Sequence, residues 1–176
     1  MFKYCPHCAS QNIGFERNRV FRCPDCGFVY YHNIAAATGL VISTDRGILL
    51  IERAKEPARG KFALPGGFVD PGEGAVDGLR RECREEIGWD PGPSVNLYAS
   101  FPNIYPYKGI VYNTCDLFFT ISAQSLCGQD LSVDPKEISG ICFIRAEEVS
   151  MDDLAFDSTR RAIKAFQEAI KQPRNR

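Results

Sequence analysis

The sequence predicts an α+β fold, in which a small metal-binding module precedes a larger domain built of strands and helices. Three observations predict it. Two C-x-x-C pairs occupy the first 26 residues, short apolar runs typical of strands follow, and two segments carry apolar residues at helical spacing. We therefore expect a zinc ribbon over residues 1–34 and one globular domain over residues 35–176.

Composition excludes several classes of protein. Of the 176 residues, 44% are apolar and 24% are charged, which is ordinary for a globular chain. The 21 basic and 22 acidic residues leave a net charge of −1, which gives no electrostatic case for non-specific binding to nucleic acid or membranes. No apolar run approaches the ~20 residues of a membrane span, and the first residues do not resemble a secretory signal. We expect a cytoplasmic location.

The N-terminal cysteines form two pairs that are separated by fourteen residues. In a reducing compartment disulfides are disfavoured, whereas four thiolates suit a tetrahedral zinc ion. Residues 1–34 are also too few to bury a stable core without a covalent cross-link or a bound metal ion. The pairs therefore predict a structural zinc site whose ligands are Cys5, Cys8, Cys23 and Cys26.

Other residues of this module support a ribbon and leave one alternative open. Val20–Arg22 lies within a segment, 13–22, that can form a short hairpin, and Gly27 suits a turn with positive φ. His7, inside the first pair, is either an exposed residue or a substitute ligand. The basic bias is small, so the case for RNA binding is weak; its residues are Lys3, Arg17, Arg19 and Arg22 against Glu16 and Asp25.

The sequence of the larger domain predicts several strands followed by a C-terminal helix. Segments 35–42 and 47–51 predict a hairpin, and segments 95–101, 111–121 and 138–144 predict three more strands. In the segment 111–121, one buried face is predicted for the alternating residues Cys115, Leu117, Phe119 and Ile121. A helix is expected from Asp157 or Ser158 to Lys171.

A glycine-rich loop over residues 64–73 leads into a second helical pattern. Val76, Leu79, Cys83 and Ile87 are spaced 3, 4 and 4 residues apart, which predicts one buried stripe, and Gly88 fits the C-terminal cap. Beside the stripe, three carboxylates share one face of the helix because they lie at positions i, i+3 and i+4: Glu82, Glu85 and Glu86.

Two interpretations of these three glutamates are possible from the residues alone. They form either a solvated helix face or a site for a hard divalent cation, for which oxygen ligands without histidine favour Mg²⁺ or Mn²⁺. The loop before the helix favours the metal site, because its exposed backbone can meet a metal ion or a phosphate.

The same segment resembles the Nudix box, G-x5-E-x7-R-E-U-x-E-E-x-G-U, where U is a bulky aliphatic residue. Gly67, Glu73 and the run Arg81–Trp89 match every fixed position, although Cys83 and Trp89 are unusual at the U positions. The ribbon running into Tyr30–Tyr31 and the segment 134–137 are similar to the NADH pyrophosphatase branch, whose N-terminal domain this sequence lacks. The loop expected at 100–108 departs from the substrate motif of that branch.

The resemblance implies a fold and an activity. The fold is a Nudix α/β/α sandwich with a mixed sheet. The activity is a MutT-like hydrolase of phosphorus-containing acid anhydrides, which uses Mg²⁺ or Mn²⁺ to cleave the diphosphate bond of a nucleoside diphosphate linked to another moiety. The substrates that the resemblance favours are NADH, NAD, ADP-ribose and related dinucleotides. A homodimer is expected. The alternative is a non-catalytic Nudix module that binds a nucleotide or RNA and acts as a regulator.

The resemblance also implies roles for particular residues. Glu82, Glu85 and Glu86 would hold the catalytic metal, with a carbonyl of Gly66 or Gly67. Glu137 is a further ligand, the general base, or a solvated loop carboxylate. Arg81 and Glu73 either pair to orient the helix or form an ordinary surface ion pair. Arg53 either contacts phosphate or ends a strand in solvent. The aromatic residues that either stack on a base or belong to the core or rim are Phe62, Phe101, Tyr105, Tyr107 and Tyr112.

Overall fold

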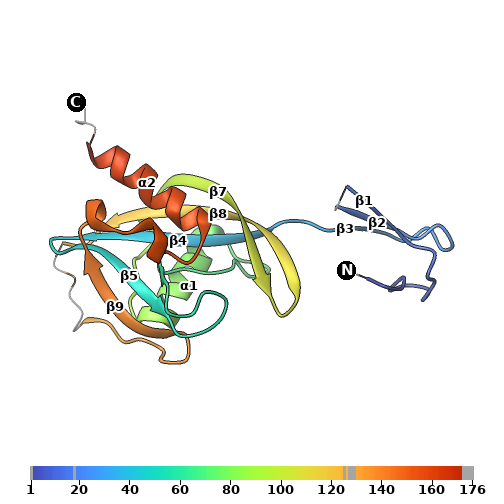
Figure 1. Cartoon of the computed structure of the whole chain (residues 1–176), viewed down its shortest axis with the longest axis horizontal. Helices are drawn as coiled ribbons and strands as arrows, with labels where there is room; N and C mark the ends of the chain where they lie inside the picture. The colour runs from blue at the N-terminus through green and yellow to red at the C-terminus, as the bar shows by residue number, and fades with distance from the viewer. Residues whose placement is uncertain (1, 18, 125, 127–129, 172–176) are drawn as a thin grey trace. The chain divides into compact units, whose positions relative to one another are not determined.

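The computed structural model describes every residue except 1, 18, 125, 127–129 and 172–176 (Figure 1). Its contacts divide the chain into two compact units, Met1–Ile34 and Ala35–Arg176. Each unit has its own sheet and its own core, and each is treated separately below.

The first unit is a three-stranded antiparallel sheet of β1 (Gly14–Glu16), β2 (Val20–Arg22) and β3 (Val29–Tyr31), in that order. The expected hairpin corresponds to β1 and β2, whereas β3 was not predicted because its three residues are too few to show a periodicity. Gly27 has the expected positive φ, 74°. The buried apolar residues of this unit are Cys5, Phe21 and Cys23, so its core is very small.

The second unit is a mixed six-stranded sheet between two helices, which confirms the predicted α+β sandwich. The strand order is β6 (Phe62–Ala63), β5 (Gly47–Arg53), β4 (Ala35–Thr44), β8 (Ile110–Ser122) and β7 (Asn96–Tyr107), and β9 (Ile138–Ile144) also pairs with β5. Strands β4 and β8 are parallel, and the other pairs are antiparallel. No helix among the described residues is long and apolar enough to span a membrane.

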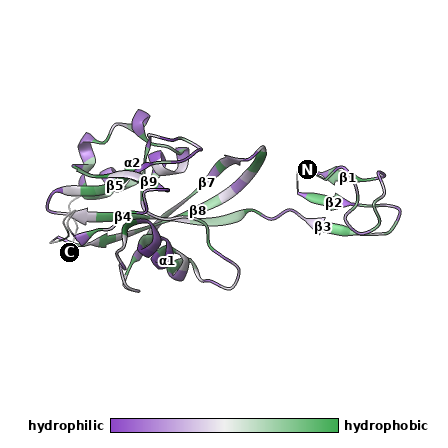
Figure 2. Ribbon diagram, turned by 90° about the horizontal axis from the view of Figure 1, so that it is seen from below, coloured by the Kyte–Doolittle hydropathy of each residue, from purple (hydrophilic) through white to green (hydrophobic). Residues whose placement is uncertain are grey.

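Helices α1 (Ala75–Ile87) and α2 (Asp157–Lys171) cover opposite faces of this sheet (Figures 1 and 2). The stripe of α1 packs as predicted, with Leu79, Cys83 and Ile87 fully buried in one core cluster. On the other face, Ala162 and Ile163 of α2 pack in a second cluster. Two short 3-10 helices, η2 (Ala146–Glu148) and η3 (Met151–Asp153), precede α2.

Because both faces are covered, β8 is buried on both sides, and the prediction of one buried face was incomplete. Phe119 faces the α1 cluster as expected, while Thr114, Asp116 and Phe118 alternate on the opposite face and are also buried. A second difference concerns the expected loop at 100–108. It is strand up to Tyr107 and forms a long hairpin with β8, because cross-strand pairing extends from Asn96 to the end of β7.

The sheet separates between β4 and β5. These strands pair only at Ser43–Ile48 and Thr44–Gly47, and β5 then runs alongside β9. The freed edge of β4 is instead bonded by the glycine-rich loop: the Thr38 N–H donates to the Gly67 carbonyl at 2.8 Å, and the Leu40 N–H donates to the Pro65 carbonyl at 2.9 Å. This separation leaves room for a cavity.

Candidate active site

A cavity of about 280 Å³ opens between the separated strands of the second unit. Its walls come from β4, β5, β7 and β8, the glycine-rich loop, α1, and the start of α2. Of the residues that the sequence singled out, the lining includes Arg53, Gly66, Gly67, Glu82, Glu85, Glu86, Tyr105 and Glu137.

The three glutamates of α1 differ strongly in burial. Glu86 is 7% exposed, and its Oε2 accepts a hydrogen bond of 2.9 Å from the Gly66 N–H. Burial raises the pKa of Glu86 to about 8 and also raises the pKa of Glu82. Glu85 is exposed at the cavity mouth. Neighbouring carboxylates in a desolvated position need a cation to hold their charge, and oxygen donors are the ligands that a hard divalent metal ion prefers. Among the described residues, the three glutamates do not form a group whose oxygens all lie within 4.8 Å of one another.

Arg81 holds two of these carboxylates and the preceding loop in one arrangement. Its Nε donates to Glu73 at 2.8 Å, its Nη1 to Glu82 at 2.8 Å and to Glu85 at 3.2 Å, and its Nη2 to the Phe68 carbonyl at 2.9 Å. The Arg81 hydrogen bonds hold the pKa of Glu73 below its usual range. The guanidinium therefore links the loop, the start of the helix and the glutamate face through several directed bonds.

The glycine-rich loop approaches the helix more closely than side chains would permit. A Cβ on Gly67 would lie 2.5 Å from Glu82 Cδ, and a Cβ on Gly66 would lie 2.3 Å from the Thr38 carbonyl oxygen. Gly66 also has φ of 137°, a conformation that L side chains rarely adopt. Both glycines are thus required by contact with the carboxylate or with β4.

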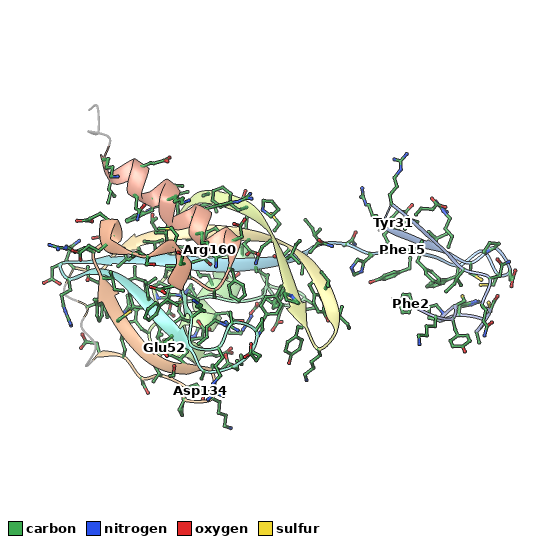
Figure 3. All side chains as sticks on the ribbon, in the orientation of Figure 1. Phe2, Phe15, Tyr31, Glu52, Asp134 and Arg160 are labelled. Atoms are coloured by element: carbon green, nitrogen blue, oxygen red, sulfur yellow. The ribbon has the colours of Figure 1, made fainter. Side chains whose placement is uncertain are left out.

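Glu137 reaches the cavity from the loop before β9, although it is 51 residues beyond Glu86 in the sequence. The Asp134 N–H lies 3.4 Å from the Glu86 carbonyl oxygen, and the Ala54 N–H donates to the Glu137 carbonyl at 2.8 Å. The Lys55 ammonium forms an ion pair with the Glu137 carboxylate. In Figure 3, Glu52 on β5 and Asp134 lie at the same end of the unit, near this junction.

Arg53, at the end of β5, is among the residues that line the cavity. Its Nε donates to the Pro57 carbonyl at 2.8 Å, and its Cζ lies 5.0 Å from the centre of the Phe156 ring. The buried Nη2 has no hydrogen-bond partner within the described part of the chain. A buried guanidinium nitrogen of this kind fits an anionic ligand.

The aromatic candidates separate into two groups. Tyr105 lines the cavity and lies 5.5 Å from Phe156, ring centre to ring centre. Phe62 and Phe101 pack against the α2 cluster, and Tyr107 is an exposed residue of β7. Tyr112 packs against Phe68, 6.4 Å between ring centres.

Several residues that line the cavity were not predicted as site residues from the sequence. They are Lys55, Phe68, Asn103, Thr114, Asp116, Phe156 and Thr159. Phe156 belongs to the loop before α2, where no periodicity marks it. Thr114 and Asp116 could have been found from the alternation of β8, because they occupy the face opposite Cys115 and Leu117.

The four N-terminal cysteines converge in the first unit. Their sulfurs all lie within 4.8 Å of one another, with Cys5–Cys26 and Cys8–Cys23 distances of 3.6 Å. Four sulfurs about 2.3 Å from a tetrahedral zinc ion would be about 3.8 Å apart, so the cluster fits such an ion. The His7 ring stacks on Phe28, with 6.1 Å between ring centres, and is not part of the cluster.

Comparison with known proteins agrees with this geometry. Residues 33–166 match the model of the NUDIX domain. An ADP-ribose pyrophosphatase of Methanocaldococcus jannaschii is 46% identical over 104 residues, which are 58% of this chain and 60% of that protein. A NAD-capped RNA hydrolase NudC of Deinococcus radiodurans is 33% identical over 164 residues, which are 92% of this chain and 55% of that protein.

Solved structures resemble the fold. A NUDIX hydrolase from Nitrosomonas europaea superposes with a TM-score of 0.67 at 23% identity, and the match covers 98% of this chain and 95% of that one. The NUDIX domain of Shewanella oneidensis NrtR, complexed with ADP ribose, gives a TM-score of 0.64 at 20% identity over 80% of this chain and 90% of that one.

The chain spans only part of the curated relatives it matches, 60% of the M. jannaschii protein and 38% of a NudC from Chromobacterium violaceum. The domain match nevertheless covers most of the sequence, and four of the box residues that it contains line the cavity: Gly67, Glu82, Glu85 and Glu86. The chain therefore belongs to the Nudix family.

Proposed function

We propose that this protein is a Mg²⁺- or Mn²⁺-dependent pyrophosphohydrolase that cleaves the diphosphate bond of a nucleoside diphosphate linked to another moiety. One observation carries the proposal: the glutamate face of α1, with its two desolvated carboxylates, lines the same cavity as an unsatisfied Arg53 guanidinium nitrogen. A site for a cation thus adjoins a site for an anion. The names of the M. jannaschii and D. radiodurans relatives support ADP-ribose and NAD-type dinucleotides as the substrate class.

Each residue has a role in this proposal. Glu82, Glu85 and Glu86 hold the metal with the Gly67 carbonyl, and Glu137 is a further ligand or the base that takes a proton from water. When bound, the divalent ion neutralises the diphosphate and lowers the pKa of a coordinated water. Arg81 and Glu73 keep the glutamate face in place.

The substrate contacts of the proposal lie at the other side of the cavity. Arg53 donates to a phosphate oxygen through Nη2, which has no hydrogen-bond partner among the residues that the structure describes. A bond between two charged groups is stronger than one between neutral groups. Tyr105 offers a ring face to the base. Phe62, Phe101 and Tyr107, which do not line the cavity, are assigned at most an indirect part in substrate binding.

The remaining expectations belong to the same proposal. The cysteine cluster holds a structural Zn²⁺ ion, the protein is cytoplasmic, and it forms a homodimer as the family resemblance suggests. Light scattering of the purified chain tests the dimer: a monomeric mass at micromolar concentration would contradict it. A role in binding RNA has weak support, from the NudC relatives alone.

A substrate panel tests the activity. NADH, NAD, ADP-ribose, FAD, diadenosine polyphosphates and NAD-capped RNA are incubated with Mg²⁺ or Mn²⁺, and the products are resolved by chromatography. Cleavage at the diphosphate of at least one dinucleotide is expected. Binding of ADP-ribose without cleavage of any compound would instead favour the non-catalytic Nudix module.

Two variants test the glutamate face. Glu85→Gln and Glu86→Gln should each lower kcat by about 100-fold or more, because each removes one charged oxygen donor while keeping the shape of the side chain. Glu168→Gln, on the exposed surface of α2, is the matched control and should retain full activity. Wild-type rates in both cavity variants would remove this assignment.

A further inference from the structure

The cavity contains a fifth acidic residue, which lies outside the glutamate face of α1 and the Glu137 loop. Asp116 is on β8, is 8% exposed, and lines the cavity together with its neighbours Thr114 and Phe118. It pairs across the sheet with Ala37 of β4 and Phe101 of β7. Asp116 therefore lies on the sheet floor of the cavity.

The hydrogen bonds of Asp116 leave part of its carboxylate free. Thr114 Oγ1 donates to Oδ1 at 2.5 Å, and Ser158 Oγ, in the first turn of α2, donates to Oδ2 at 2.6 Å. An ionised carboxylate has about four acceptor positions, so these two hydroxyls occupy about half of them. Among the described residues no lysine or arginine forms an ion pair with Asp116. A buried carboxylate with unused acceptor positions is stabilised by any further hydrogen-bond donor that enters the cavity.

The charge at this position selects the kind of donor. The cations that line the cavity, Arg53 and Lys55, come from β5 and the residues after it, and Lys55 pairs with Glu137. A phosphate beside Asp116 would meet a second anion and would be repelled. A neutral donor would not be repelled, and Tyr105 and Phe156 supply ring faces in the same cavity.

We propose that Asp116 is a specificity-determining residue that accepts a hydrogen bond from the nucleoside part of the substrate. The inference rests on the proposed function, since it takes the ligand to be a nucleotide. Two donors of an adenosine nucleotide share the required chemistry, the exocyclic amine of the base and the ribose hydroxyls. Carboxylates accept from both kinds of donor in other proteins.

A purely structural role for Asp116 would have a different signature. Through Ser158 the carboxylate also ties the start of α2 to β8, so its loss could disturb the cavity as a whole. That disturbance would weaken every nucleotide by the same factor. A direct contact weakens only those ligands that carry the donor.

The experiment measures binding of mononucleotides that contain no diphosphate bond to cleave. Isothermal calorimetry with Mg²⁺ compares AMP, IMP and 2′,3′-dideoxy-AMP, on the full wild-type chain, on Asp116→Asn, and on Ser158→Ala. The amide places a donor where a carboxylate oxygen accepted. We therefore expect Asp116→Asn to weaken AMP binding about 10- to 100-fold.

The two analogues identify the donor. If the contact is with the amine, IMP binds the wild type more weakly than AMP does, and Asp116→Asn does not weaken IMP binding further, because the amide N–H can donate to the carbonyl oxygen that replaces the amine. If the contact is with the ribose hydroxyls, 2′,3′-dideoxy-AMP binds the wild type as weakly as AMP binds Asp116→Asn, and the substitution does not weaken the dideoxy compound further. Ser158→Ala keeps the Asp116 carboxylate. It should therefore retain the preference for AMP over the analogue that lacks the donor, whichever of the two that is.

Several results would overturn the proposal. They are an equal loss for all three nucleotides in Asp116→Asn, no loss for any, or wild-type protein that binds the three equally or binds none. If Asp116→Asn does not fold, equal binding of the three nucleotides by the wild type still overturns the proposal. Hydrolysis of ADP-ribose is measured in parallel: cleavage without nucleoside discrimination removes only the role of Asp116, whereas discrimination without cleavage removes only the hydrolase.

Discussion

The Glu82 carboxylate occupies the space that a side chain at position 67 would fill. A methyl group there would lie 2.6 and 2.7 Å from the two carboxylate oxygens, well inside van der Waals contact. The Arg81 bond holds Glu82 from the other side. The loop and the helix thus fix the position of this oxygen donor jointly, which explains why a glycine is needed at the start of the box.

Gly67→Ala should therefore displace Glu82 and reduce catalysis while leaving the fold intact. Small misplacements of a reacting group reduce rates by up to about 100-fold, and we expect kcat/KM to fall at least about tenfold. Steady-state kinetics across a Mg²⁺ titration is the measurement. Gly140→Ala is the control, because its Cβ would lie 3.4 Å from the nearest atom of Glu52, an ordinary contact. Equal kinetics in the two variants would contradict the steric argument.

Site residues that are close in the sequence could be predicted from their spacing. Site residues that only the fold brings together could not. Glu82, Glu85 and Glu86 share a face because a helix repeats every 3.6 residues, so their spacing was sufficient. Asp116 and Phe156 enter the cavity from β8 and from the loop before α2. Their positions depend on strand order and on the separation of β4 from β5, which no local period encodes.

Helix α1 is fixed at its C-terminus by two sets of contacts. Gly88 caps it with φ of 67°, and the Ser132 N–H donates to the Ile87 carbonyl at 3.0 Å. Beyond the cap, Asp90 accepts from Arg80 Nε at 2.9 Å, from Arg84 Nη1 at 2.8 Å, and from the Gly92 N–H at 2.8 Å. The Asp90 bonds fix the residues after the helix to its last turns, and the Ser132 bond joins the end of the helix to the segment that leads to Glu137.

Asp90→Asn should destabilise the protein at neutral pH but not in acid. The hydrogen bonds from Arg80 and Gly92 lower the pKa of Asp90 in the folded state below its value of about 3.9 in the unfolded chain. The stabilisation is then complete above pH ~4 and is lost as the pH falls through the folded-state pKa. Because the side chain is partly exposed and screened, we expect a loss of about 0.5–1 kcal/mol at pH 7.

Urea unfolding at a series of pH values measures this effect. The difference between wild type and Asp90→Asn should shrink steadily below pH ~4. Glu168→Gln, which removes an exposed carboxylate of α2, should show no such trend. A difference for Asp90→Asn that stays constant from pH 7 to the lowest accessible pH would contradict an electrostatic origin.

The elements with a clear period were predicted, and those without one were not. Helices α1 and α2 and strand β9 begin and end close to the predicted residues, because each carries a buried stripe or run bounded by a cap or turn. Strand β6, of two residues, and β3, of three, are too short for a pattern. The outer half of β7 was missed because prolines at 102 and 106 resemble loop signals, yet this half pairs with β8 as far as Tyr107.

At the scale of the whole molecule, the two units obtain their stability in different ways. The second unit buries two apolar clusters, one on each face of its sheet. Among its described residues, 2–17 and 19–34, the first unit buries Cys5, Phe21 and Cys23, of which two belong to the cysteine cluster. So small a core cannot offset the conformational entropy of folding, and we therefore propose that a metal ion held by the cysteine cluster supplies most of the stabilisation of this unit.

Removal of the metal should therefore unfold the first unit and leave the second intact. Protein purified without added zinc is expected to contain about one zinc per chain by elemental analysis. After treatment with a strong chelator, Cys5, Cys8, Cys23 and Cys26 should react rapidly with a thiol reagent. The single tryptophan, Trp89, packs against the α1 cluster, so its fluorescence should not change. A zinc-free protein that keeps the first unit folded through disulfides would contradict the metal site, and a shifted tryptophan spectrum would contradict the independence of the two cores.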